Sequence, residues 1–112
     1  MPSQPSGDPD ASVLQQLASA GDDPAKSRIV NFYLYFPTEK AAQAAAAEIA
    51  QSGFLPVVRP AAKGPEWLCF ATKSTVPTLE ALHVARKQLN DAAQRNGGEY
   101  DGWESPVLKP AH

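Results

Sequence analysis

Large apolar residues alternate with other side chains between residues 28 and 36, in the most regular pattern of the chain. A period of two is typical of a strand with one buried face. The face predicted to point inward carries Val30, Phe32, Leu34 and Phe36. The other face carries Asn31, Tyr33 and Tyr35.

A second alternating stretch covers residues 66–74. We place Leu68, Phe70 and Thr72 on one face of this strand and expect the two large apolar side chains to join the core. The opposite face then carries Trp67, Cys69, Ala71 and Lys73. The predicted core consists of Val30, Phe32, Leu34, Phe36, Leu68, Phe70, Ile49, Leu82 and Leu89.

Three stretches have features that predict helices. The first begins at Asp8 and Pro9, which suit an N-cap and a first helical position, and it ends at Gly21. The second covers residues 39–52 and is rich in alanine, the strongest helix former. The third precedes Gly97. The apolar stripes of the first and third helices are formed by Val13, Leu14, Leu17 and Ala18 and by Leu79, Leu82, Leu89 and Ala93.

Two further strands, residues 54–59 and 99–104, are less apolar. Pro56 removes a hydrogen-bond donor from the first and Gly102 weakens the second, so we expect both at sheet edges. The element order is therefore a helix followed by βαββαβ, which is typical of a ferredoxin-like split sandwich. We predict an α+β fold with a four-stranded antiparallel sheet, in which the two more apolar strands are central.

The length of 112 residues indicates one domain. Residues 1–9 are rich in proline and serine, and we expect a disordered N-terminal tail there. The single domain is predicted to cover residues 10–105. Residues 106–112 contain two prolines and are predicted to form a loose C-terminal tail.

The charges are nearly balanced, with 10 basic and 12 acidic residues and a net charge of -2. A nucleic-acid partner held by charge alone is therefore not expected. The single cysteine, Cys69, excludes an intramolecular disulfide and fits a reducing, cytoplasmic location. The first residues lack the pattern of a signal peptide, and no stretch approaches the roughly 20 apolar residues of a membrane span, so we expect no membrane association.

The residues that carry chemistry form no recognisable catalytic or metal-binding pattern. His83 is isolated in the third helix, His112 is terminal, and neither has an evident partner in the sequence. Cys69 lies inside an apolar strand, where an unreactive thiol is expected. We therefore predict no enzyme activity, no cofactor and no metal.

The stretch of residues 97–105 places two aromatic side chains among carboxylates and glycines. The pair at 101 and 102, Asp-Gly, suits either a plain turn or a bulge that changes the direction of Trp103. The aromatic residues either complete the core or anchor a partner, and both hold if one points inward and the other outward. The candidate partner-binding residues are Asp22, Asp23, Glu99, Tyr100, Asp101, Trp103 and Glu104.

The second face of the sheet offers an alternative site. Tyr33, Tyr35 and Trp67, with Lys73, are predicted to lie side by side there, as aromatic residues do in modules that stack RNA bases. We favour instead a first helix that covers this face, because its apolar stripe needs a surface and the chain lacks a basic surround.

Three features together resemble the RraB family, regulators of ribonuclease E activity. They are the Gly-Asp-Asp-Pro turn at residues 21–24, the aromatic strand that ends at Phe36 and Pro37, and the Tyr-Asp-Gly-Trp motif at residues 100–103. The resemblance covers residues 10–105 and implies a ferredoxin-like domain without catalytic activity. It also implies that the domain binds and inhibits ribonuclease E without contacting RNA. Some members end in a strongly acidic extension, whereas residues 105–112 hold no acidic side chain.

Two functional hypotheses follow. The first is a protein-binding regulator, with ribonuclease E as the partner that the resemblance implies. The second is a single-stranded RNA-binding module that uses the aromatic sheet face. A homodimer without a client enzyme is a third alternative. An open and basic sheet face favours RNA, whereas a covered or acidic face favours a protein partner.

Overall fold

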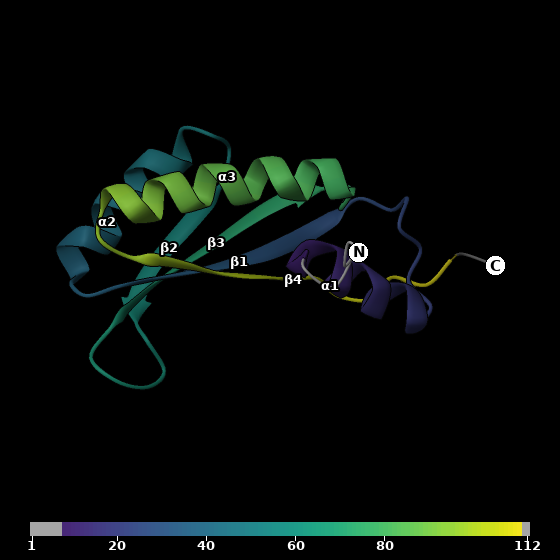
Figure 1. The fold of residues 1–112 in the computed structure, drawn as a ribbon, viewed down its shortest axis with the longest axis horizontal. Helices are drawn as coiled ribbons and strands as arrows, with labels where there is room; N and C mark the ends of the chain where they lie inside the picture. The colour runs from purple at the N-terminus through teal and green to yellow at the C-terminus, as the bar shows by residue number, and fades with distance from the viewer. Residues whose placement is uncertain (1–7, 111–112) are drawn as a thin grey trace, which may run out of the picture.

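The computed structural model describes residues 8–110, which form three helices and four strands (Figure 1). In chain order the elements are α1 (Pro9–Ser19), β1 (Arg28–Phe36), α2 (Glu39–Ala50), β2 (Leu55–Pro60), β3 (Trp67–Thr75), α3 (Leu79–Arg95) and β4 (Glu99–Glu104). Helix α1 begins where the sequence predicts, with the Asp8 carboxylate accepting the N–H groups of Asp10 and Ala11. Residues 1–7 of the expected N-terminal tail lie outside the described residues.

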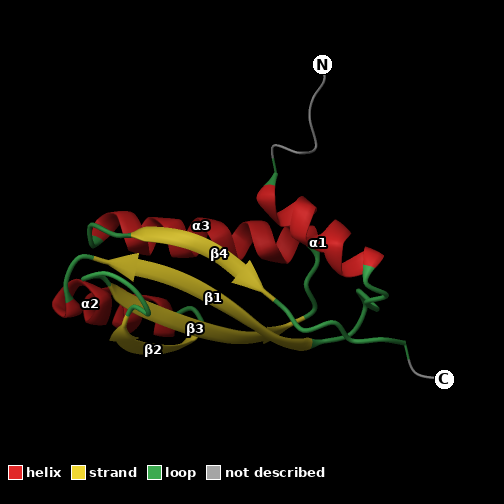
Figure 2. Ribbon diagram, turned by 90° about the horizontal axis from the view of Figure 1, so that it is seen from below, coloured by secondary structure: helices red, strands yellow, loops and turns green. Residues whose placement is uncertain are grey.

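The four strands form one antiparallel sheet in the order β2-β3-β1-β4. This is the ferredoxin-like order, and it confirms that β1 and β3 are central. Helices α2 and α3 lie side by side behind the sheet in Figure 2 and cover one of its faces. No described helix is long and apolar enough to cross a membrane.

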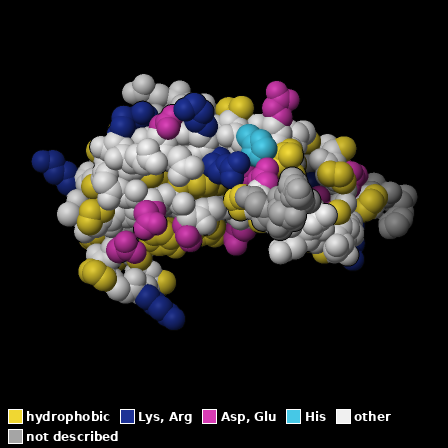
Figure 3. Space-filling model, in the orientation of Figure 1, with side chains coloured by type: hydrophobic (Ala, Val, Ile, Leu, Met, Phe, Trp, Pro, Cys, Tyr) yellow, Lys and Arg dark blue, Asp and Glu magenta, His cyan; other side chains and the backbone are white. Residues whose placement is uncertain are grey.

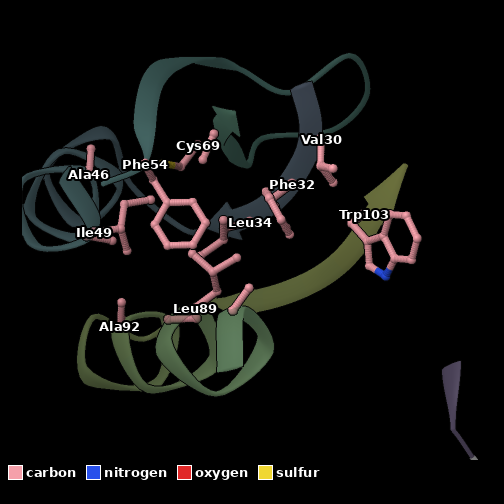
Figure 4. Close-up of a cluster of buried hydrophobic side chains, with 14 of the residues drawn as sticks. Val30, Phe32, Leu34, Ala46, Ile49, Phe54, Cys69, Leu89, Ala92 and Trp103 are labelled. Carbon is pink, nitrogen blue, oxygen red and sulfur yellow. The ribbon is translucent and has the colours of Figure 1, made fainter. Parts of the chain in front are cut away.

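The core lies between the sheet and these two helices (Figure 4). Seven of the predicted core residues are buried in it, namely Val30, Phe32, Leu34, Phe36, Ile49, Leu82 and Leu89. Phe54, which directly precedes β2, adds a large side chain that packs edge-to-face on Phe32 with ring centroids 5.3 Å apart. Burial of these apolar side chains is the main term that stabilises the fold.

The predicted orientation of β3 is wrong. Cys69 lies opposite Leu34 in the β1–β3 ladder, and Phe70 lies opposite Tyr33. Directly opposed residues of an antiparallel pair share a face, so Cys69 faces the helices and Phe70 faces away from them. Leu68, although buried, also lies on the face away from the helices. Small side chains fit on the helix-facing side of β3 because the alanine-rich α2 packs close to the sheet.

Helix α1 does not cover the second sheet face, contrary to our expectation. In Figure 2 it lies beyond the end of the sheet, next to α3. Leu17 reaches the main core, and Val13 and Leu14 pack against it. The apolar stripe of α1 is thus partly buried, with Leu17 buried and Ala18 exposed, at the margin of the helix layer. The second sheet face is therefore not covered by any described helix.

Candidate functional site

The candidate site begins with a β-bulge in β4. Tyr33 pairs with Gly102 and Leu34 pairs with Tyr100, so Asp101 is an extra residue in the ladder. Gly102 has a φ of 118°, a conformation that favours glycine. Of the two local structures considered from the sequence, the bulge is the one observed.

The bulge places both aromatic residues of the motif on the helix side of the sheet. Without the extra residue, Tyr100 and Trp103 would point to opposite faces, because side chains alternate along a strand. Trp103 is only 8% exposed and belongs to the core, and Tyr100 packs against that core. Of the two interpretations, the one in which the aromatic residues complete the core is observed, and Trp103 is not an exposed anchor.

The carboxylates of β4 remain on the surface. Glu99, Asp101 and Glu104 are exposed, and Glu66 lies close to the first two beside a shallow depression of about 260 Å³ that Tyr35 also lines. We call Glu66, Glu99, Asp101 and Glu104 the acidic edge. Acidic side chains are visible over β4 and near the β2–β3 hairpin in Figure 3.

Glu104 is tied to the sheet by side-chain hydrogen bonds. Its Oε2 accepts the hydroxyl proton of Tyr33 at 2.8 Å and an amide proton of Asn31 at 3.4 Å. Burial raises the pKa of the Tyr33 hydroxyl, and the hydrogen bond to Glu104 and its negative charge raise the pKa further. The acidic edge is therefore ordered at its junction with β1.

The uncovered sheet face continues from the acidic edge toward β2. We call it the open sheet face and define it by Ile29, Tyr33, Tyr35, Leu55, Val57 and Phe70. Leu55 is 71% exposed, and Ile29 and Val57 are also exposed. The Tyr33 and Phe70 rings meet edge-to-face at 5.3 Å, and the Arg59 guanidinium lies 5.0 Å from the Phe70 centroid. Exposed apolar patches of this kind commonly mark interaction sites.

We expected Trp67 and Lys73 to lie beside Tyr33 and Tyr35, but their side chains lie on the opposite face of the sheet. Trp67 lies opposite Phe36 and packs against the core on the helix side. The Lys73 ammonium donates to the Ser52 carbonyl at 3.2 Å and lies 4.7 Å from the Phe54 ring centroid. This difference follows from the reversed orientation of β3.

Asp22 and Asp23 make structural contacts and are not part of the acidic edge. The Asp22 carboxylate accepts from Arg28 at 2.7 Å, with both side chains almost fully buried, and from the Leu108 N–H at 2.8 Å. The Asp23 carboxylate accepts the Ala25 N–H at 3.1 Å. These contacts give both aspartates a structural role in ordering the turn.

The same region contacts the segment that we predicted to be a loose C-terminal tail. Besides the Leu108 N–H bond, the Leu108 carbonyl accepts the Asp23 N–H at 2.7 Å, and the Lys109 carbonyl accepts from Lys26 at 3.0 Å. Residues 106–109 are thus bound to the domain rather than loose, because the backbone of this segment hydrogen-bonds to residues 22–26. Residues 111–112 lie outside the described part of the chain.

The candidate reactive groups have two different environments. Cys69 is fully buried, and burial raises the pKa of its thiol to about 11, which keeps it protonated at neutral pH. His83, in contrast, has a partner that sequence reasoning missed, since its Nε2 lies 2.7 Å from Oδ2 of Asp8. These two residues are separated by 75 positions, and no local spacing indicates their contact.

The fold and the exposed surface define a class of protein: a small ferredoxin-like α+β domain with helices on one sheet face and an apolar, acid-bordered surface on the other. The model of the RraB family, described as Regulator of ribonuclease activity B, matches residues 8–105. The chain therefore belongs to the RraB family, as the motifs in the sequence predicted. A comparison with curated proteins found no match.

Proposed function

We propose that this chain is a non-catalytic regulator that binds a ribonuclease, with ribonuclease E as the partner, and thereby modulates RNA turnover. Membership of the RraB family carries the proposal, because the family description is that of a regulator of ribonuclease activity. A cytoplasmic location belongs to the same proposal, since a regulator must share the compartment of its nuclease.

The contact surface in this proposal is the open sheet face together with the acidic edge. β2 and β4 are the outer strands of the sheet and lie roughly 14 Å apart, three strand spacings. A partner segment of ordinary length can therefore touch the carboxylates of β4 and the exposed Leu55 and Val57 of β2 at the same time. Such a surface suits a segment that carries basic side chains beside apolar ones.

The two parts of the surface have different roles in binding. The apolar side chains of the open sheet face supply most of the affinity when they are removed from water. The carboxylates of the acidic edge mainly raise the association rate, and salt screens their effect.

A binding experiment with purified ribonuclease E and its fragments tests the proposal. Glu99→Gln combined with Asp101→Asn should weaken binding, more at 50 mM than at 500 mM salt. Leu55→Ser combined with Val57→Ser should weaken it at both salt concentrations. The control is Glu39→Gln combined with Glu80→Gln, which removes the same charge from the first turns of α2 and α3 and should leave binding unchanged. Absence of binding by the wild type, or equal effects of the test and control variants, would refute the proposal.

Single-stranded RNA binding is the second candidate function. The observation in its favour is the Tyr33–Phe70 pair, with Arg59 stacked on Phe70, on the open sheet face. The acidic edge opposes it, since carboxylates repel phosphates. Fluorescence anisotropy with labelled oligonucleotides separates the candidates: an affinity lost on Tyr33→Ala would favour RNA, whereas no binding favours the protein partner. Sedimentation of the isolated chain tests the homodimer.

A further inference from the structure

A cluster of polar side chains joins the start of α1 to α3, at a distance from the open sheet face. It consists of Asp8 and Asp10 from the start of α1 and His83 and Arg86 from α3. Figure 3 shows acidic, basic and histidine side chains gathered where these helices meet. Neither the family description nor the proposed function assigns a role to this cluster.

The Asp8 carboxylate is held in a defined orientation. Its Oδ1 accepts the N–H of Asp10 at 3.0 Å and the N–H of Ala11 at 3.4 Å, as an N-cap side chain does. Its Oδ2 is directed toward Nε2 of His83, 2.7 Å away. One oxygen therefore fixes the helix start while the other faces the cluster.

The second carboxylate, Asp10, is buried with an incomplete set of partners. Its side chain is only 3% exposed, and its Oδ1 accepts the indole N–H of Trp103 at 2.9 Å. Among residues 8–110 its Oδ2 accepts no hydrogen bond, although Nε of Arg86 lies 3.4 Å away and Nε2 of His83 lies 3.9 Å away. A buried carboxylate oxygen without a hydrogen-bond donor lowers the stability of the fold unless a cation lies close to it.

These three side chains offer one imidazole nitrogen and two carboxylate oxygens within 4.8 Å of one another. Zinc binds such atoms at about 2.0–2.2 Å, which separates tetrahedral ligands by roughly 3.4 Å. The observed distances from Nε2 of His83, 2.7 Å to Asp8 and 3.9 Å to Asp10, lie on either side of this value. Shifts of less than 1 Å in these side chains would let an ion bind between His83 and the two aspartates. His83 is 41% exposed, which leaves an entry path and a water position.

We propose that Asp8, Asp10 and His83 bind a divalent transition-metal ion of the zinc class, which clamps the start of α1 to α3. An imidazole with two carboxylates favours zinc, cobalt or nickel over magnesium or calcium. The indole of Trp103 orients Asp10 as a supporting hydrogen-bond donor does in metal sites. The expectation of no metal rested on spacing along the chain, which does not reveal this three-dimensional grouping.

Arg86 sets the affinity of this site. Its guanidinium lies 3.4 Å from Asp10 and 3.8 Å from Asp8 and competes with the ion for the same carboxylates. Its side chain is partly exposed and has room to move, because it borders a cavity of about 290 Å³ that Asp101 also lines. Removal of this positive charge should therefore strengthen metal binding. In a cluster of ion pairs alone, the same change would only weaken the contact between α1 and α3.

Titration of the untagged, chelator-treated chain with zinc, and with cobalt as a spectroscopic probe, tests the proposal. We expect one ion per chain, a thermal midpoint that rises with zinc, and cobalt absorption bands of a tetrahedral site. His83→Gln should abolish these signals, and Arg86→Gln should tighten binding about tenfold or more. His112→Gln is the matched control, because it removes the other histidine and should leave binding unchanged.

Three results would overturn the proposal: no binding by the wild type, binding that survives His83→Gln, or binding lost on His112→Gln. Circular dichroism without metal establishes that each variant is folded. Should His83→Gln fail to fold, Asp8→Asn serves in its place, because asparagine retains the N-cap function but is a poorer metal ligand. Ribonuclease binding is measured separately, so failure of the metal site does not bear on the regulator proposal.

Discussion

The indole Nε1 of Trp103 donates a hydrogen bond of 2.9 Å to Oδ1 of Asp10, which is 93 positions away in the chain. Both residues are buried, and the bond connects the Tyr-Asp-Gly-Trp segment of β4 with the first turn of α1. The tryptophan of the motif therefore has a structural role: it fixes α1 against the rest of the domain.

The first prediction is that Trp103→Phe lowers the free energy of unfolding by about 1.5–3 kcal/mol, because a buried carboxylate loses its donor. Urea denaturation followed by circular dichroism measures the loss. Partner binding by the folded variant should match the wild type, since Trp103 does not reach the open sheet face. A loss under half a kilocalorie would contradict the assigned role.

The second prediction concerns the buried ion pair between Asp22 and Arg28. Asp22→Asn should cost about 3–5 kcal/mol, because it leaves the guanidinium without its charge partner. Glu80→Gln, an exposed change, serves as the control and should remain within about 0.5 kcal/mol of the wild type. Chemical denaturation at pH 7 measures both.

The pH dependence of stability follows from the same pair. Burial by itself would raise the pKa of Asp22, but the hydrogen bonds from Arg28 and Leu108 and the Arg28 charge outweigh it, so the pKa lies below its ordinary value of 3.8. The unfolded chain therefore binds this proton more readily than the folded chain. The stabilisation from Asp22 is complete well above pH 3.8 and is lost as the pH falls through the lower folded value. The difference between wild type and Asp22→Asn should accordingly shrink below pH 4.

The third prediction concerns the close approach of Gly98 to β1. A Cβ at this position would lie 2.4 Å from the Tyr35 carbonyl oxygen and 2.3 Å from Cδ1 of Phe36. Gly98→Ala should therefore destabilise the domain by about 1–3 kcal/mol or more, because backbone and core would have to shift. Thermal unfolding measures the effect, with Gln94→Ala on the exposed side of α3 as control. An unchanged midpoint for Gly98→Ala would contradict this packing.

The fourth prediction is that Cys69 reacts with a disulfide reagent only after the domain opens. The thiol is fully buried, so the reagent cannot reach it. Burial also raises the pKa of the thiol to about 11, so the reactive thiolate is scarce at pH 8. Labelling of the native chain at pH 8 should be far slower than labelling in urea. A native rate close to that of the unfolded chain would place Cys69 at the surface.

Element order and edge strands were predictable from the sequence because they depend on local signals. Asp8 and Pro9 start α1, and the order of helices and strands selects the ferredoxin-like sheet. The orientation of β3 was not predictable in this way. Both of its faces carry apolar residues, and only the register with β1, together with the close approach of α2, selects Cys69 and Ala71 for the core.

The candidate site was predictable only in part. The exposed carboxylates at 99, 101 and 104 were recognised from the sequence, but the direction of Trp103 depends on a bulge in the ladder with β1. Asp22 carries the same charge as these carboxylates, but it is buried in an ion pair with Arg28. The contact of Asp8 with His83 spans 75 positions and has no local signal. Pairings of this kind depend on how the elements pack.

The last prediction tests the two faces of the sheet directly by comparing Leu34→Ala with Phe70→Ala. Leu34 is fully buried between the sheet and the helices, so its truncation removes apolar contacts and leaves a cavity. Phe70, on the next strand, is only half-buried on the open sheet face. Leu34→Ala should therefore cost about 2–5 kcal/mol, whereas Phe70→Ala should cost less.

Partner binding should show the opposite order. Loss of the Phe70 ring removes part of the open sheet face, and it also frees Tyr33 and Arg59 from their contacts with that ring. Denaturation curves and binding isotherms on the same two variants measure both effects. If Phe70→Ala destabilises the domain as much as Leu34→Ala and leaves binding unchanged, Phe70 belongs to the core and the open sheet face is not the partner surface.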